Sequence, residues 1–253
     1  MNARKLWALL FLAVPVLGVW SFWIAPGLEW WLPRKNVSSF GGQIDHLFYV
    51  ILWITGITFV ATEVVLAWFL FRYAGDGTSR KALYIQGHHR TEVIWTLVPA
   101  GILVFIAMYQ MSAWREIKFK SQFPAPPSVR VVAGQFEWRV FYPGDDGKLG
   151  TLDDLVSVNV FHAPVGVPVV FELRSRDVLH SFFLPELRLK QDAVPGMTIP
   201  VWFQADQTGK FDLPCAELCG WGHYKMKGRL IVESEGDFRK FLADLKAEQG
   251  AVE

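Results

Sequence analysis

The feature that most constrains this chain is a set of three apolar runs, each as long as the hydrocarbon core of a bilayer requires. They cover residues 6–24, 47–71 and 93–111. About 20 apolar residues in a helix cross that core, because backbone polar groups inside lipid must be satisfied within the helix itself. A hydrophobic content of 52% agrees with a chain that lies partly in a membrane. We therefore predict membrane-spanning helices in the N-terminal half.

The first apolar run has two interpretations. It follows Arg4 and Lys5, as the apolar part of a signal peptide follows a basic segment, but it is long and no A-x-A-like cleavage site stands out. Residues 1–30 are therefore either a signal peptide or an extra transmembrane helix. Residues 31–114 are predicted to form a transmembrane helical hairpin.

The connection between the second and third runs predicts how the hairpin is oriented. This short connection carries Arg72, Arg80, Lys81 and Arg90. Short basic loops stay in the cytoplasm. We expect a multi-pass protein of the cell inner (plasma) membrane with its C-terminal domain, residues 115–253, on the periplasmic face. The net charge of +1 gives no support for a nucleic-acid partner.

Two carboxyl groups lie within or beside the apolar runs. Glu63 is inside the second run and Glu92 begins the third. An ionised side chain is costly in a bilayer, so such acids pair with neighbours or mark proton pathways. We expect Glu63 to be structural, facing a neighbouring subunit, and we keep Glu92 as a functional candidate.

From Ser128 onward the sequence changes to short runs of β-branched and aromatic residues separated by Pro and Gly. Residues 129–132, 155–161, 167–173 and 229–232 are the expected strands, a pattern typical of a sandwich or barrel. Apolar residues at helical spacing predict a terminal helix over residues 235–251. The chain is thus predicted to be a membrane-anchored all-β protein.

The strongest signal is the segment Cys-Ala-Glu-Leu-Cys-Gly-Trp-Gly-His-Tyr-Lys-Met at residues 215–226, with one histidine upstream. Thiolate, imidazole and thioether ligands together favour copper. Two thiolates can each bridge two metal ions, so two Cys, two His, one Met and one backbone carbonyl suffice for a binuclear copper centre. The candidate ligands are His180, Cys215, the Glu217 carbonyl, Cys219, His223 and Met226.

Other interpretations of this segment stay open. Zinc accepts two Cys and two His, although the Met and the C-x3-C-x3-H-x2-M spacing favour copper. A disulfide between Cys215 and Cys219 would close only a small ring and constrain the unfolded chain little. A copper chaperone or storage protein would need exposed, exchangeable ligands, and it gives no reason for a membrane hairpin that bears Glu92.

With these motifs the chain resembles cytochrome c oxidase subunit II, the CuA-containing subunit of haem-copper terminal oxidases. The 215–226 segment resembles the CuA loop of that family, and residues 179–182 resemble its upstream ligand segment. Residues 189–196 resemble its K-x-D-x-x-P-G run, and residues 92–99 the start of its second helix. The resemblance implies a cupredoxin-like Greek-key β-barrel on a transmembrane hairpin.

The resemblance also implies a function. Such a subunit passes electrons from a c-type cytochrome, or another periplasmic donor, through CuA to the haems of subunit I, where oxygen is reduced. Its partners are subunit I and the other oxidase subunits. By position, the side chain of Glu217 helps to hold a magnesium ion at the subunit I interface, and Glu92 lies near the mouth of a proton-uptake path. A copper-containing nitric oxide reductase or related haem-copper enzyme remains the alternative.

One motif departs from the family pattern. Gln135-Phe136-Glu137-Trp138 stands where the family usually has Gln-Trp-aromatic-Trp. Trp138 is retained, whereas Phe136 replaces the tryptophan that in the family lies at the surface where cytochrome c delivers electrons. Both are candidates for electron input, and the substitution leaves the donor or its docking geometry open.

Overall fold

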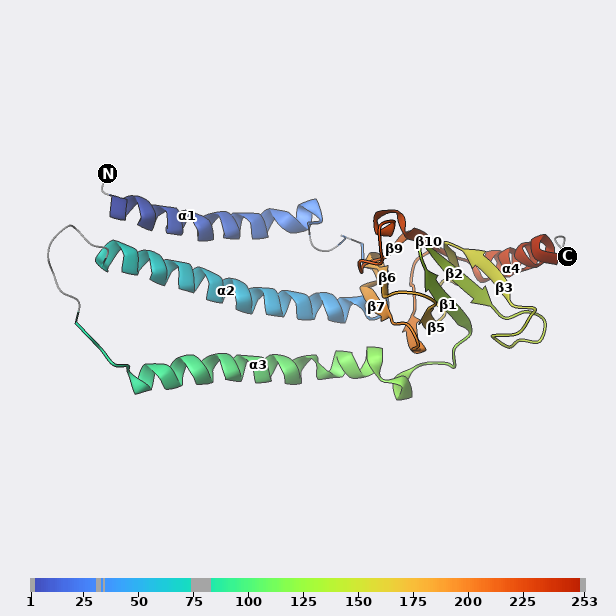
Figure 1. The fold of residues 1–253 in the computed structure, drawn as a ribbon, viewed down its shortest axis with the longest axis horizontal. Helices are drawn as coiled ribbons and strands as arrows, with labels where there is room; N and C mark the ends of the chain where they lie inside the picture. The colour runs from blue at the N-terminus through green and yellow to red at the C-terminus, as the bar shows by residue number, and fades with distance from the viewer. Residues whose placement is uncertain (1–2, 31–32, 34, 74–82, 251–253) are drawn as a thin grey trace. The chain divides into compact units, whose positions relative to one another are not determined.

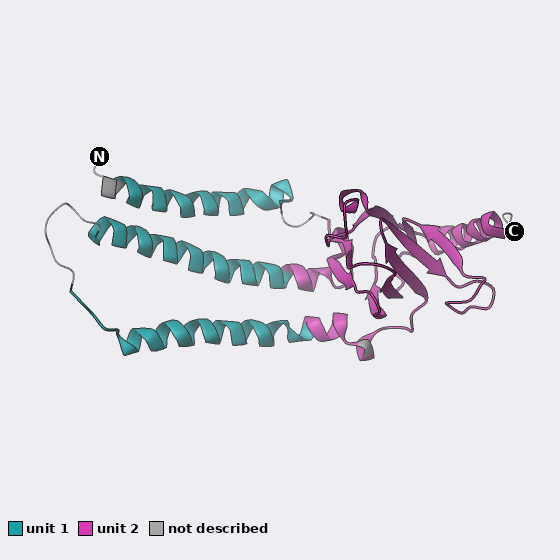
Figure 2. Cartoon of the chain, in the orientation of Figure 1, with its two compact units in different colours: residues 1–32, 46–112 teal, residues 33–45, 113–253 magenta. Residues whose placement is uncertain are grey.

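The computed structural model describes residues 3–30, 33, 35–73 and 83–250. Arg80 and Lys81 of the basic connection lie outside the described residues. The chain divides into two compact units, residues 1–32 with 46–112 and residues 33–45 with 113–253 (Figure 2). The first unit is helical and the second contains the strands.

The first unit consists of long apolar helices (Figure 1). They are α1 (Ala3–Ile24), which the 3-10 turn η1 (Ala25–Leu28) follows, and most of α2 (Gly41–Tyr73) and α3 (His89–Lys118). All three are long and apolar enough to cross a membrane, and they coincide with the three apolar runs. The most apolar stretch of α3 has no buried residue within this chain. Lipid or other subunits must therefore cover that surface.

The second unit is built from ten described strands in three sheets. One sheet has the order β3-β2-β1-β5-β8, a second has the order β4-β10-β9, and β6 pairs with β7. The β1–β5 and β4–β10 pairs are parallel and the other pairs are antiparallel. Strands distant in sequence thus lie side by side, as the expected cupredoxin-like barrel requires, and that fold class is confirmed. The strands are β1 (Val129–Gly134), β2 (Glu137–Tyr142), β3 (Leu155–Val158), β4 (Val160–Pro164), β5 (Val169–Ser175), β6 (His180–Leu184), β7 (Leu189–Ala193), β8 (Ile199–Phe203), β9 (Gly209–Pro214) and β10 (Lys227–Glu233).

Aromatic side chains fill the core of the barrel. Phe161 meets Phe171 and Phe203 with ring centroids 5.6 Å away in each case, and Phe182 lies 5.0 Å from Phe171. All four rings are fully buried. Tilted and edge-to-face pairs of this kind stabilise a core beyond the burial of their area. Strands β4, β5, β6 and β8 are therefore held in fixed relative positions.

The predicted terminal helix is confirmed as α4 (Glu235–Gly250), which packs on the barrel. Its Phe241 stacks on His162 of β4, with ring centroids 3.6 Å apart, and His162 Nδ1 lies 2.8 Å from Glu233 Oε1. The helix thus covers one side of the core.

The run 155–161, expected as one strand, is two strands, β3 and β4. Asn159 separates them because its backbone adopts a φ of 61°, a left-handed conformation that Asn tolerates better than most residues. Its side-chain oxygen accepts a hydrogen bond of 2.9 Å from the Trp138 amide. Hydrophobic alternation alone does not reveal such a break.

An ion pair ties the start of α2 to the barrel within the second unit. The side chain of Arg188 is only 4% exposed, and its Nε lies 2.6 Å from Asp45 Oδ1. It also donates hydrogen bonds to the carbonyls of Pro33 and Pro185, at 2.8 and 2.9 Å. One buried cation therefore organises segment 33–45 and the turn after β6.

We expect Asp45→Ala to lower the free energy of unfolding by about 2 kcal/mol, because it leaves the Arg188 cation without its carboxylate. Thermal unfolding of the full chain in detergent, followed by circular dichroism, measures this loss. The control is Asp212→Ala, which removes the exposed partner of Arg229 and should cost less than about 0.5 kcal/mol. Equal losses in the two variants would show that the buried pair has no special role.

Candidate metal centre

The cysteine-containing segment is a loop between two adjacent strands, β9 and β10. Its ends are joined by a hydrogen bond of 3.0 Å from the Cys215 amide to the Met226 carbonyl. A second hydrogen bond, from the Ala216 amide to the Ser181 carbonyl, connects the loop to β6. The first residue of β6 is His180. The sheet therefore brings the loop and the distant histidine to one place.

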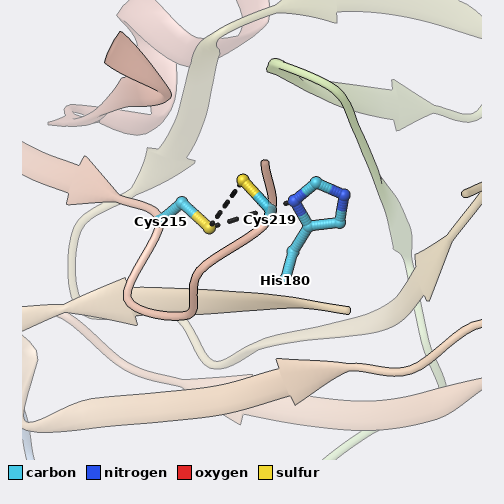
Figure 3. Close-up of side chains that lie close together, drawn as sticks. All are labelled: His180, Cys215 and Cys219. Carbon is cyan, nitrogen blue, oxygen red and sulfur yellow. Dashed lines mark hydrogen bonds between the residues drawn. The ribbon is translucent and has the colours of Figure 1, made fainter. Parts of the chain in front are cut away.

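The two cysteines and His180 form a compact buried cluster (Figure 3). Cys215 Sγ lies 3.9 Å from Cys219 Sγ and 3.9 Å from His180 Nδ1. The ligand atoms of the three residues all lie within 4.8 Å of one another. Both cysteines are free, and their separation is far from the roughly 2.05 Å of a disulfide bond. The cluster is therefore a thiol site in this structure.

The remaining three predicted donors also lie beside the two sulfurs. Cys219 Sγ is 3.6 Å from His223 Nδ1 and 3.8 Å from Met226 Sδ, and Cys215 Sγ is 3.3 Å from the Glu217 carbonyl oxygen. Each sulfur thus has its own histidine and one further weak donor. Such a set fits soft metal ions shared between two thiolates, because every donor adjoins one of the two sulfurs.

Asp177 fixes the orientation of His180. Its Oδ1 lies 2.8 Å from His180 Nε2, and its Oδ2 accepts a hydrogen bond of 2.7 Å from the Gln135 amide. The other ring nitrogen of the buried histidine therefore faces the sulfurs. Carboxylates behind metal-binding histidines commonly set the tautomer in this way. Asp177 is not among the predicted site residues, although its position three residues before a candidate ligand is a signal in the sequence.

The two thiols have different pKa values because their surroundings differ. Burial opposes ionisation of Cys215, but hydrogen bonds with His180 and with the backbone of Ser181 and Glu217 lower its pKa to about 6. Burial, followed by repulsion from the Cys215 charge, raises the pKa of Cys219 to about 11. The metal-free site thus holds one thiolate near neutral pH, which prepares it to bind a cation.

The other predicted residues have different surroundings. Trp138 is fully buried, with its ring centroid 6.2 Å from that of His180, and the half-buried Phe136 contacts the exposed Trp221. The side chain of Glu217 is partly exposed. Glu92 is an exposed residue in the first turn of α3 and belongs to the other unit, so it is not part of the cluster.

Fold and site together define a membrane-anchored cupredoxin-like protein with a buried histidine–cysteine cluster that could hold a metal ion. Residues 35–112 match the family described as Cytochrome C oxidase subunit II, transmembrane domain, and residues 135–234 match its periplasmic domain. The chain therefore belongs to the cytochrome c oxidase subunit II family, a subunit of haem-copper oxidases.

The chain is also similar to individual known proteins. The chain is 34% identical over 248 residues to the alternative cytochrome c oxidase subunit 2 of Bradyrhizobium diazoefficiens, covering 87% of this chain and 86% of that protein. It is 27% identical over 270 residues to cytochrome c oxidase subunit 2 of Thermostichus vulcanus, covering 86% and 79%. A crystal structure of the periplasmic domain of subunit II (CoxB) of Bradyrhizobium japonicum is 30% identical, covering 49% of this chain and 96% of that domain, with a TM-score of 0.43.

In the metal-free chain, ultraviolet thiolate absorbance should rise in two steps, the first at a pH of about 6 and the second at about 11. His180→Asn should move the first step upward, because the imidazole hydrogen bond that favours the Cys215 thiolate is lost. The control is His162→Asn, which changes a histidine packed on α4 instead. A single step for both thiols near the ordinary pKa of roughly 8.5 would contradict this assignment.

Proposed function

We propose that the chain is the electron-input subunit of a haem-copper respiratory oxidase. It accepts electrons from a c-type cytochrome or another periplasmic donor and passes them, through a binuclear copper centre, to the haems of subunit I. The observation that carries this proposal is the convergence of six donors, two thiol sulfurs 3.9 Å apart and four further donors beside them. The ligands are His180, Cys215, the Glu217 carbonyl, Cys219, His223 and Met226.

The chain's own residues suit one-electron transfer. Cys215 and Cys219, with the other four donors, would hold two copper ions, and such a centre would supply one-electron chemistry in which both metals share a single electron. His180, Cys215 and Cys219 are at most 7% exposed, so water is largely kept from the donors. The loop is pinned at both ends by neighbouring strands, so the donors change position little when the charge changes. These features favour fast electron transfer at a centre that binds no substrate.

We propose the same domain organisation that the sequence predicts. Residues 31–114 form the transmembrane hairpin, and residues 115–253 form the copper-bearing domain on the periplasmic face. Residues 1–30 are a signal peptide or an extra helix. The orientation is supported by the basic connection between the second and third apolar runs, which carries Arg72 and Arg90 among its described residues.

Glu217 is proposed to serve two sites. Its carbonyl faces Cys215, while its partly exposed side chain has no hydrogen bond or ion pair among the described residues. That carboxylate is therefore available to hold a magnesium ion at an interface with subunit I, since carboxylate oxygens suit this hard cation.

A nitric oxide reductase with the same copper loop is the second candidate within haem-copper enzymes. A copper chaperone or storage protein is disfavoured by the burial of the donors, because exchange with a partner needs accessible ligands. His180 is fully buried and Met226 is only 2% exposed. These values support a resident centre instead of one that hands copper on.

Cys219→Ser should abolish the mixed-valence copper signal in electron paramagnetic resonance, because one of the two bridging thiolates is removed. Reduction by a c-type cytochrome and oxygen consumption by the assembled oxidase should be lost with it. Tyr224→Phe, an exposed position on the same loop, is the control and should keep the copper spectrum. An unchanged spectrum in the Cys219 variant would exclude it as a ligand.

We propose that Glu92 lies at the mouth of a proton-uptake path, as its exposed position in the first turn of α3 allows. Glu92→Ala should slow turnover of the assembled oxidase by at least about tenfold without loss of copper, because a proton-transfer group is removed. Glu63→Gln is the matched control, as we expect that carboxyl to be structural. Wild-type turnover in the Glu92 variant would assign it a structural role as well.

A further inference from the structure

The metal-binding loop carries an exposed aromatic patch, Trp221 and Tyr224 with Lys225, which none of the proposed ligands accounts for. Trp221 is 81% exposed and Tyr224 is 75% exposed. Lys225 Nζ lies 5.9 Å from the ring centroid of Trp221 and 5.4 Å from that of Tyr224. Adjacent exposed apolar side chains, unlike single ones, mark surfaces that contact a partner, and Trp and Tyr are enriched in such interfaces.

Trp221 occupies a distinctive place in the loop. It lies between Cys219 and His223, so its backbone is part of the segment that holds two proposed ligands. Its ring rests edge-on against Phe136, with centroids 5.3 Å apart at an interplanar angle of 72°. A continuous aromatic contact therefore connects the solvent-exposed indole with the half-buried phenyl ring beneath it.

Glycines on both sides of Trp221 make this arrangement possible. A Cβ at position 222 would lie 2.5 Å from Phe136 Cδ2, and one at position 220 would lie 3.3 Å from the same ring. Gly220 also has a φ of 133°, which side chains rarely adopt. The loop sequence Gly-Trp-Gly thus lets Phe136 pack directly beneath the loop while Trp221 points outward.

The charge on the patch indicates the kind of partner. No carboxylate of the described residues forms an ion pair with Lys225. Glu137 pairs with Arg139 and Arg176, and Asp177 holds His180. Glu217, on the same loop, is the carboxylate that we propose for the subunit I interface. The charge that lies directly at the two aromatic rings is that of Lys225, and it is positive. Complementary charge steers association, so this surface fits an acidic partner better than a lysine-rich one.

We infer that Trp221 is the contact through which electrons reach the metal centre. The exposed indole stands on the metal-binding loop itself, and position 136 supplies the phenyl ring beneath it. The partner is an electron-donor protein whose exposed redox cofactor is ringed by acidic side chains. In the transfer, the reduced cofactor of the donor loses one electron and the copper centre gains it. No bond forms and no proton moves. This inference rests on the proposed function.

The test uses the full copper-loaded chain in detergent and one c-type cytochrome in two forms, native with its lysines and succinylated so that the lysines become carboxylates. We measure the second-order rate of copper reduction by each form and the Kd of each for the metal-free chain. Wild type should prefer the succinylated form, and higher ionic strength should reduce that preference, because surface charges are screened.

Trp221→Ala should lower the rate and weaken the Kd with the succinylated form by about tenfold or more, as expected for a central aromatic contact. Lys225→Glu should reverse the preference toward the native form. Trp114→Phe, at an exposed tryptophan of α3, is the control and should change neither quantity. Electron paramagnetic resonance and reduction by ascorbate should be unchanged in every variant, which shows that the centre is intact.

Unchanged rate and Kd in Trp221→Ala would overturn the inference, as would a wild-type preference for the native form that Lys225→Glu does not alter. If one of these results is found together with a normal mixed-valence signal, only the inference about Trp221 is wrong and the proposed electron-input function is unaffected. If the wild-type chain lacks that signal, the proposed function is wrong, and the inference that rests on it is wrong as well.

Discussion

The site depends on one short backbone contact, the hydrogen bond of 3.0 Å that closes the Cys215–Met226 loop across β9 and β10. Because these strands are neighbours in a sheet, the two ends of the loop have fixed positions, and the donors between them must turn inward together. The bond from Ala216 to Ser181 then fixes the loop against β6, whose first residue is His180. The rigid β scaffold therefore positions the donors before any metal binds.

The electrostatics of the site follow from the same packing. Two thiols 3.9 Å apart cannot both ionise easily in a buried site, so one is a thiolate near neutral pH and the other retains its proton. Asp177 orients His180 toward the sulfurs and offsets positive charge on its ring. A cation that binds to both sulfurs removes the repulsion between them. Metal binding, thiol ionisation and the order of the loop are therefore coupled.

Much of this structure could be predicted from the sequence, and the reasons differ by element. The apolar runs and the terminal helix follow from periodicity, and the ligand loop follows from donor chemistry at close spacing. The break at Asn159 depends on a left-handed backbone conformation, which hydrophobic alternation does not encode. The contact of Asp177 with His180 is local, but its hydrogen bond with the Gln135 amide and the Phe136–Trp221 contact join segments that are distant in sequence, so only the sheet topology brings them together.

The central claim is that the six donors hold two copper ions that share one electron. Low-temperature electron paramagnetic resonance with copper quantification on the full chain, reconstituted with copper in detergent, tests it most directly. The account predicts about two copper ions per chain and a mixed-valence signal with hyperfine splitting from both metals. A mononuclear copper signal, or zinc bound in place of copper, would contradict it.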